Sequence, residues 1–217
     1  MTLAVVPVKR LAVGKSRLAA KIAREDLEAL SLAMLQDILA ALAQTPSVSR
    51  RAVVTPDAEV AEAATAAGAI ALLRPDPGLN ESVDAATREL VESPAEALLV
   101  VLGDVAGARA ADLEALFEAV AAAPRPSIAL APSRDGGTSA LLRAPHDAIP
   151  SLFGPESAKR HREAAASAGV LCKELQLPSL AVDLDLAEDV DRFLASESAD
   201  GARTRAVLQS IGWGQAR

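Results

Sequence analysis

The chain has little of several features on which whole classes of protein depend. It has one cysteine, Cys172, in 217 residues, which excludes an internal disulfide framework and a cysteine-based zinc site. Aromatic residues make up 2% of the chain, so there is no set of rings on which nucleic-acid bases stack. Although 51% of the residues are hydrophobic, no window approaches the ~18 consecutive apolar residues of a transmembrane helix. We therefore expect neither a nucleic-acid partner nor a membrane span.

The chain also lacks an excess of basic residues. Its net charge of −7 and its pI near 5.0 argue against a nucleic-acid surface and favour small ligands. The first residues, Met1 to Val6, lead directly into a strand pattern, without the basic start, apolar stretch and small-residue cleavage site of an export signal. We expect a cytoplasmic protein.

What the chain does have is an alternation of strand and helix patterns. Short apolar runs rich in β-branched residues recur at 3–8, 51–55, 69–73, 97–102 and 127–131. Helical spacing of apolar residues fills the intervals at 24–43, 57–67, 80–92 and 110–123. The run at 97–102 is almost continuously apolar, which is typical of a parallel strand covered on both faces. The pattern predicts a doubly wound α/β sheet.

The pattern of the sequence changes after Pro132. A glycine turn at 136–137 leads into a strand, and further patterns predict helices at 157–168 and 187–195 and strands at 170–176 and 180–183. The last segment, 196–217, contains one short amphipathic piece at 204–211, which we expect to be a peripheral helix. With no repeat and no linker, the sequence indicates a single domain over residues 1–217.

A cationic cluster follows the first predicted strand, where open α/β sheets bind ligands. Four basic residues, Lys9, Arg10, Lys15 and Arg17, stand within nine positions of an acidic protein. The tripeptide from Gly14 resembles the end of a Walker A loop, but that motif needs glycine at position 9, which is lysine, so we exclude a P-loop. The cluster is either a phosphate-binding loop or a solvated charge cluster.

Carboxylates follow two later strands. Asp104 comes directly after the strand at 97–102, and Asp183 and Asp185 alternate at the end of the strand expected at 180–183. Ligands that are all carboxylate oxygens suit magnesium. Either set is alternatively a helix cap, since Asp185, for example, precedes the helix that carries Glu188 and Asp189.

Other polar positions carry weaker signals. The turn from Arg74 delivers Asn80 to the start of a helix, where it either caps that helix or recognises a ligand. His146 and His161 have no carboxylate or cysteine at ligand spacing, so we expect both to be structural or on the surface. Trp213 is expected to be a packing anchor, and Cys172 a buried thiol.

Six motifs in this order resemble the guanylyltransferases of coenzyme F-420 biosynthesis over residues 3 to about 195. The motifs are Val6-Pro7-Val8-Lys9, Lys15-Ser16-Arg17-Leu18, Pro75 to Asn80, Gly137 to Leu142, Phe153 to Ser157 with Arg160-His161, and Val182 to Asp185. The resemblance implies a Rossmann-like nucleotidyltransferase fold of GT-A type, a three-layer sandwich on a mostly parallel mixed sheet. It also implies transfer of GMP from GTP to 2-phospho-L-lactate, phosphoenolpyruvate or 3-phosphoglycerate, with release of pyrophosphate.

The resemblance also assigns roles by position. Residues 1–132 become the nucleotide-binding half and 133–195 the acceptor-binding half. The residues implied are Lys9, Lys15 and Arg17 for the triphosphate, Pro7, Val8, Gly78, Leu79 and Asn80 for the nucleotide, Asp104, Asp183 and Asp185 for Mg²⁺, and Thr138, Gly154 and Ser157 for the acceptor. The resemblance implies that Asp104 is catalytic, together with Lys9, Lys15 and Arg17. No protein nucleophile is needed, because positioning and charge stabilisation supply most of the acceleration.

Two segments depart from the family pattern. The segment 102–107 lacks the usual proline-flanked acidic turn, which predicts a looser metal loop, and 134–139 lacks the usual alternating Gly-Thr. A transferase with another acceptor, such as a sugar phosphate or a molybdopterin, and a nucleotide-binding protein without catalysis therefore stay as alternatives. The expected partners are GTP, a small phosphorylated acid and a downstream transferase that receives a labile product, and a homodimer is compatible with the sequence.

Overall fold

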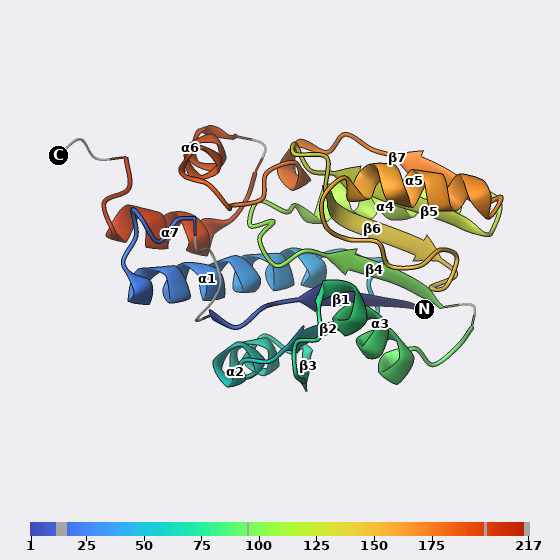
Figure 1. The fold of residues 1–217 in the computed structure, drawn as a ribbon, viewed down its shortest axis with the longest axis horizontal. Helices are drawn as coiled ribbons and strands as arrows, with labels where there is room; N and C mark the ends of the chain where they lie inside the picture. The colour runs from blue at the N-terminus through green and yellow to red at the C-terminus, as the bar shows by residue number, and fades with distance from the viewer. Residues whose placement is uncertain (12–16, 95, 198, 215–217) are drawn as a thin grey trace.

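The structure, a computed structural model, describes residues 1–11, 17–94, 96–197 and 199–214. One seven-stranded sheet with the order β3-β2-β1-β4-β6-β5-β7 runs through the molecule (Figure 1). The strands are β1 (Thr2–Pro7), β2 (Arg50–Thr55), β3 (Ile70–Leu73), β4 (Ala97–Val101), β5 (Ser127–Pro132), β6 (Thr138–Ala144) and β7 (Leu171–Glu174). The N-terminal half of the chain builds one side of the sheet and the segment after Pro132 builds much of the other.

The sheet is mixed, with β6 as the antiparallel strand. Strands β1, β2, β3 and β4 pair in parallel, so Val5 lies beside Ala52 on one side and Val100 on the other. Strand β6 runs antiparallel to both β4 and β5, and β7 is parallel to β5. The carboxyl ends of β1 to β4 therefore meet at one edge, where ligand sites of open α/β sheets form.

Helices cover both faces, so the predicted three-layer α/β fold is confirmed. The helices are α1 (Arg24–Ala43), α2 (Ala58–Ala66), α3 (Leu79–Leu90), α4 (Ala110–Ala121), α5 (Ser157–Ser167), α6 (Ala187–Ala195) and α7 (Ala202–Ser210), with a 3₁₀ turn η2 (Pro178–Leu180). Helices α1, α2 and α4 share one hydrophobic core with the sheet, and α3 and α5 share the other. Among the described residues, no helix combines the length and apolar character that crossing a membrane requires.

A third hydrophobic core lies beyond the sheet and joins segments that are distant in the chain. It unites Leu18, the N-terminal part of α1, Leu184, Phe193 of α6 and Leu208 of α7. Figure 1 shows α6 and α7 beside α1 at the same end of the molecule. The C-terminal helix, which we expected to be peripheral, buries Leu208 completely. It is therefore a packed part of the fold.

The predicted elements agree with the structure at most positions and fail at one. Helix α1 begins and ends where its apolar spacing predicts, because its apolar stripe is buried against the sheet. The strand predicted at 180–183 is wrong, since Pro178 begins a 3₁₀ turn there. The backbone around it bonds to two separate loops, with Arg134 N–H donating to Ala181 and Leu184 N–H donating to Asp104. Because no described strand lies beside the segment 180–183 to pair with it, its apolar alternation does not produce a β-strand.

Candidate functional site

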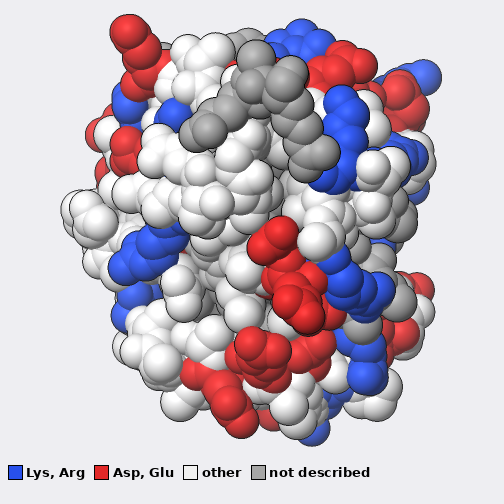
Figure 2. Space-filling view, turned by 90° about the vertical axis from the view of Figure 1, so that its left-hand side faces the viewer, with Lys and Arg blue, Asp and Glu red and all other residues white. Residues whose placement is uncertain are grey.

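A cavity of about 370 Å³ opens at the carboxyl edge of the sheet, a size that suits a small-molecule ligand. The loops after β1, β2, β3 and β4 all contribute to its walls, together with the N-terminal half of α1. Figure 2 views the molecule from this end and shows acidic side chains gathered near the middle of the face with basic side chains beside them. The cavity therefore sits where topology directs a ligand and where charges of both signs meet.

Three aspartates converge at one end of this region. Asp104, Asp183 and Asp185 each offer a carboxylate oxygen, and these oxygens lie within 4.8 Å of one another. All three residues are half-buried, and the Leu184 N–H donates to the Asp104 carbonyl at 3.2 Å. The sequence predicted that these aspartates would act together, and the fold brings them together. A donor set made only of carboxylate oxygens fits a hard divalent cation such as Mg²⁺.

The electrostatics of the aspartate group favour a cation. Burial, the largest cause, and the neighbouring carboxylates of Asp104, Asp135 and Asp185 together raise the pKa of Asp183 to about 6, against the lowering effect of a backbone hydrogen bond. Like charges beside a half-buried carboxylate destabilise its ionised form, here that of Asp183. A bound cation would offset this repulsion.

Backbone hydrogen bonds hold the segment around Asp104 in place, although it lacks the proline-flanked turn. The Leu102 N–H donates to Ser139, and the N–H groups of Val105 and Ala108 close two successive turns. A Cβ on Gly103 would lie 3.0 Å from the Pro7 carbonyl oxygen, so glycine permits the close approach of the β4 loop to the β1 loop.

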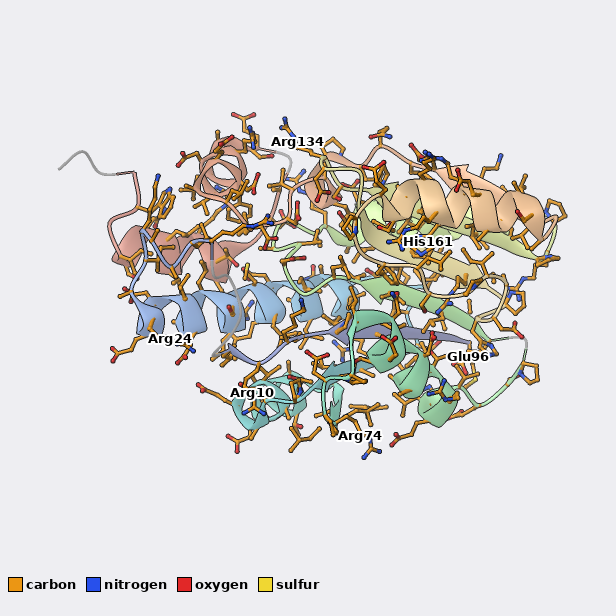
Figure 3. All side chains as sticks on the ribbon, in the orientation of Figure 1. Arg10, Arg24, Arg74, Glu96, Arg134 and His161 are labelled. Atoms are coloured by element: carbon orange, nitrogen blue, oxygen red, sulfur yellow. The ribbon has the colours of Figure 1, made fainter. Side chains whose placement is uncertain are left out.

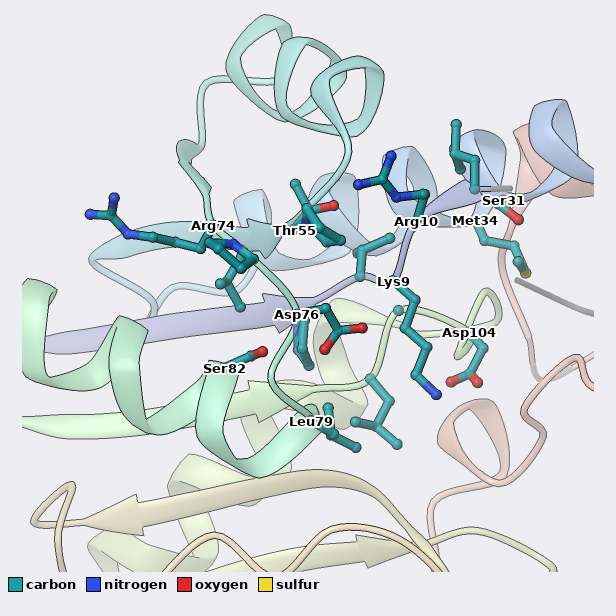
Figure 4. A pocket seen from close by; sticks show the side chains of 18 of the residues that line it. Lys9, Arg10, Ser31, Met34, Thr55, Arg74, Asp76, Leu79, Ser82 and Asp104 are labelled. Atoms are coloured by element: carbon teal, nitrogen blue, oxygen red, sulfur yellow. The ribbon is translucent and has the colours of Figure 1, made fainter. Parts of the chain in front are cut away.

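The cationic segment after β1 borders the same cavity. Pro7, Val8, Lys9 and Arg17 all line it, and the Lys9 side chain extends toward Asp104 (Figure 4). Arg10 also lines the cavity, but its side chain points away from Asp104 in the same view. Lys15 falls within 12–16, outside the described residues. Lys9 and Arg17 thus stand where an anion bound beside the aspartates would meet positive charge.

The turn before α3 forms another wall. Gly78 is the N-cap residue of α3, with φ at 133°, and Leu79 lines the cavity. The alternative that Asn80 caps the helix is therefore wrong. Its amide instead binds the backbone of Phe153, accepting from the Phe153 N–H at 2.7 Å and donating to the Phe153 carbonyl at 3.2 Å. Asn80 thus joins the start of α3 to the loop that carries Gly154.

Two of the expected acceptor residues lie in a buried polar network. The Ser157 hydroxyl donates to the Thr138 hydroxyl oxygen at 3.0 Å, and both residues are 1% exposed. The Leu152 N–H donates to Nε2 of His161, so Nδ1 carries the ring proton and donates to Thr138 Oγ1 at 3.1 Å. Gly154, by contrast, is exposed and has φ at 119°. Thr138, Gly154 and Ser157 thus come from neighbouring segments, but outside the cavity walls.

His161 organises this network from the inside. It is fully buried and contacts the Phe153 ring edge-on, and Figure 3 shows it between α5 and the sheet. Burial, the largest cause, and the nearby charges of Arg143 and Arg160 together lower its pKa to about 4. The imidazole is therefore neutral at pH 7. The sequence predicted that His161 would be structural or on the surface, and gave no sign of its contact with Thr138.

Further cavity residues had no sequence assignment. They are Thr55, Asp76 and Ser82 on the β2, β3 and α3 side, and Ser31 and Met34 on α1. The Pro-Asp-Pro-Gly turn around Asp76 was the one available signal, because a rigid turn at a strand end holds its side chains in place.

Comparisons with known proteins agree on one family. The sequence model of the family described as Guanylyl transferase CofC like matches residues 2–215. A phosphoenolpyruvate guanylyltransferase of Sphaerobacter thermophilus is 43% identical over 202 residues, 93% of this chain and 96% of that protein. A 3-phospho-D-glycerate guanylyltransferase of Colwellia psychrerythraea is 30% identical over 187 residues, 86% of this chain and 88% of that protein.

Solved structures agree on the fold. A nucleotidyl transferase from Methanothermobacter superposes with a TM-score of 0.65 at 20% identity and covers 97% of this chain and 99% of that one. A Desulfovibrio desulfuricans protein assigned as a nucleotide-diphospho-sugar transferase gives a TM-score of 0.74 at 16% identity, with coverage of 96% and 94%. The architecture is that of the nucleotidyltransferases.

Proposed function

We propose that this chain, which belongs to the family of CofC-like guanylyl transferases, transfers GMP from GTP to a three-carbon phosphorylated acid and releases pyrophosphate. The observation that carries the proposal is the aspartate group of Asp104, Asp183 and Asp185 beside a cavity lined by Lys9 and Arg17. Joining two anions requires positive charge from the protein and from a metal. One end of this cavity offers positive charge from the protein, and beside it lie carboxylates that would hold the metal.

The division of labour follows from position. Asp104, Asp183 and Asp185 would hold Mg²⁺, which when bound would neutralise phosphate charge and stabilise the leaving pyrophosphate. Lys9 and Arg17 bind the triphosphate, and we assign Lys15 to the same task from its place in the motif. Pro7, Val8 and the turn at 78–80 border the nucleoside. Their rigid attachment to strand ends and to α3 pre-orders the site.

The reaction needs no covalent intermediate on the protein. A phosphate oxygen of the acceptor attacks the α-phosphorus of GTP and forms the new P–O bond, while the bond from the α-phosphorus to the bridging oxygen breaks. The bond electrons leave with pyrophosphate. Lys9 and Arg17 stabilise the charge that builds on the departing β- and γ-phosphates, so the contribution of the protein is positioning and electrostatics.

For the acceptor we propose phosphoenolpyruvate first. The relative from Sphaerobacter bears that substrate in its name at 43% identity, and the relative named for 3-phospho-D-glycerate is 30% identical. We assign Thr138, Gly154 and Ser157 to the acceptor, with 3-phosphoglycerate and 2-phospho-L-lactate as the other candidates. The product, a phosphoanhydride, is labile, and we propose that it enters coenzyme F-420 biosynthesis through a downstream transferase.

The test is a panel of acceptors. The folded protein is incubated with GTP, MgCl₂ and each of the three acids separately, with pyrophosphate release measured by a coupled assay and products by mass spectrometry. We expect a guanylylated product with phosphoenolpyruvate. Binding of GTP without release from any acid would overturn the proposal in favour of a non-catalytic nucleotide-binding protein. Release only with a sugar phosphate or a molybdopterin would assign a different acceptor class.

A further inference from the structure

The cavity holds one carboxylate that the proposed reaction leaves unused. Among the described residues that line it, the acidic ones are Asp76, Asp104 and Asp185. The latter two belong to the aspartate group, and Asp76 does not. The loop of Asp76 leaves the edge strand β3, whereas Asp104 leaves β4 on the far side of β1. The two loops therefore enter the cavity from opposite flanks of the Pro7–Lys9 segment.

The Asp76 side chain is held in a fixed turn. The Gly78 N–H donates to its Oδ1 at 3.1 Å, and Pro75 and Pro77 flank it on both sides. Its carboxylate group faces into the pocket (Figure 4). Arg74, two residues before Asp76 in the sequence, instead pairs with Glu89 at 2.6 Å. Within the described part of the chain, no cation forms an ion pair with Asp76, so its carboxylate keeps acceptor capacity for a ligand.

Several other polar groups near the cavity already hold hydrogen bonds within the protein. The Asn80 amide is bound at both ends by the Phe153 backbone. Thr55 Oγ1 accepts from the Asp57 N–H at 3.2 Å, and the Ser31 hydroxyl donates to the Leu27 carbonyl. Asp76 is thus the acceptor-only side chain on the nucleoside flank of the described cavity.

We infer that Asp76 selects the base of the nucleotide by accepting hydrogen bonds from N1–H and the 2-amino group of guanine, an inference that rests on the proposed function. Guanine presents these two donors side by side, and a carboxylate presents two acceptor oxygens at matching spacing. Adenine places a lone pair at N1, which faces the carboxylate unfavourably. Hypoxanthine lacks the 2-amino donor, and xanthine replaces it with an oxygen.

The experiment compares nucleotides on wild type and variants. Dissociation constants for GTP, ITP, XTP and 2′-deoxy-GTP are measured by calorimetry with MgCl₂, alongside pyrophosphate release. We expect Asp76→Ala to lose about 10- to 100-fold in GTP affinity, as for a hydrogen bond to a charged group, and to bind GTP and ITP nearly equally. Asp76→Asn should gain affinity for XTP relative to GTP, because its amide donates a hydrogen bond to the xanthine oxygen. Glu62→Ala removes an exposed carboxylate on α2 and should leave every ratio unchanged.

Two results would overturn the inference. One is an Asp76→Ala protein that keeps the wild-type preference for GTP over ITP. The other is a variant that loses discrimination against 2′-deoxy-GTP instead, which would assign Asp76 to the ribose. Because base preference is read from binding, a wild type that binds GTP selectively without turnover would refute the proposed reaction and leave the role of Asp76 supported.

Discussion

The carboxylate of Asp37, in the middle of α1, accepts hydrogen bonds from both the backbone N–H and the hydroxyl of Thr204, each at 2.8 Å. Its other oxygen accepts from the Arg203 N–H at 3.2 Å. These N–H groups belong to the first turn of α7, so Asp37 caps that helix from a distant part of the chain. The cap fixes α7 against α1 and closes the third core, which also contains Leu18 and Leu184.

Removal of this cap should destabilise the protein. Asp37→Ala leaves the buried Thr204 N–H without its acceptor, and we expect the free energy of unfolding to fall by about 2–3 kcal/mol. Urea denaturation followed by circular dichroism measures the change. Glu118→Ala, which removes an exposed carboxylate from α4, is the matched control and should stay within about 0.5 kcal/mol of wild type. Equal midpoints for the two variants would show that the cap contributes little.

Loss of a carboxylate that we propose holds the metal should strongly reduce turnover with the fold intact. Asp104→Asn keeps the size of the side chain but removes one charge from the aspartate group, so we expect guanylyl transfer to fall by about 100-fold or more. The thermal stabilisation by MgCl₂ should shrink in parallel. Asp147→Asn, an exposed position outside the cavity, serves as the control. Full activity of Asp104→Asn at subsaturating Mg²⁺ would remove Asp104 from the metal site.

Lys9 should matter for the triphosphate rather than for folding. Its side chain is exposed and points toward Asp104, so Lys9→Ala removes positive charge without leaving a cavity in the core. We expect kcat/KM for GTP to decrease by about 10- to 100-fold. Lys159→Ala on α5, whose ammonium lies 3.9 Å from Glu163, removes a surface lysine elsewhere. If both variants lose activity equally, general charge rather than the β1 loop attracts the nucleotide.

Much of the fold was predictable because its signals are local. The apolar spacing of α1 gave both ends of the helix, since burial on one face requires that spacing. The segment 180–183 misled because alternation alone says nothing about a neighbouring strand, and Pro178 instead begins a 3₁₀ turn. A local pattern is therefore sufficient to predict a helix or strand where that element buries one face.

The candidate site, too, was predictable from the sequence only in part. Asp104, Asp183 and Asp185 were predicted as one group, and their oxygens do converge. The bonds between Asn80 and Phe153 join residues 73 positions apart, and no local pattern announces such a contact. The burial of Thr138 beneath His161 depends likewise on how α5 packs on the sheet. Tertiary packing decides which polar groups stay available to a ligand.

The buried imidazole of His161 should make folding stability depend on pH. Its pKa of about 4 in the folded chain lies below the ordinary value of 6.5. At a pH between these two values, the imidazole is protonated in the unfolded chain and neutral in the folded chain. The stabilisation is fully present above pH 6.5 and is lost as the pH falls toward 4, by about 3 kcal/mol for this group. His161→Gln does not titrate, so its free energy of unfolding should fall less steeply over that range. Urea titrations of both proteins at pH 4.5, 5.5, 6.5 and 7.5, values chosen to span about the shifted and the ordinary pKa, measure the two slopes. Parallel curves for the two proteins would mean that His161 takes up its proton equally in the native and unfolded chains, so that folding does not shift its pKa.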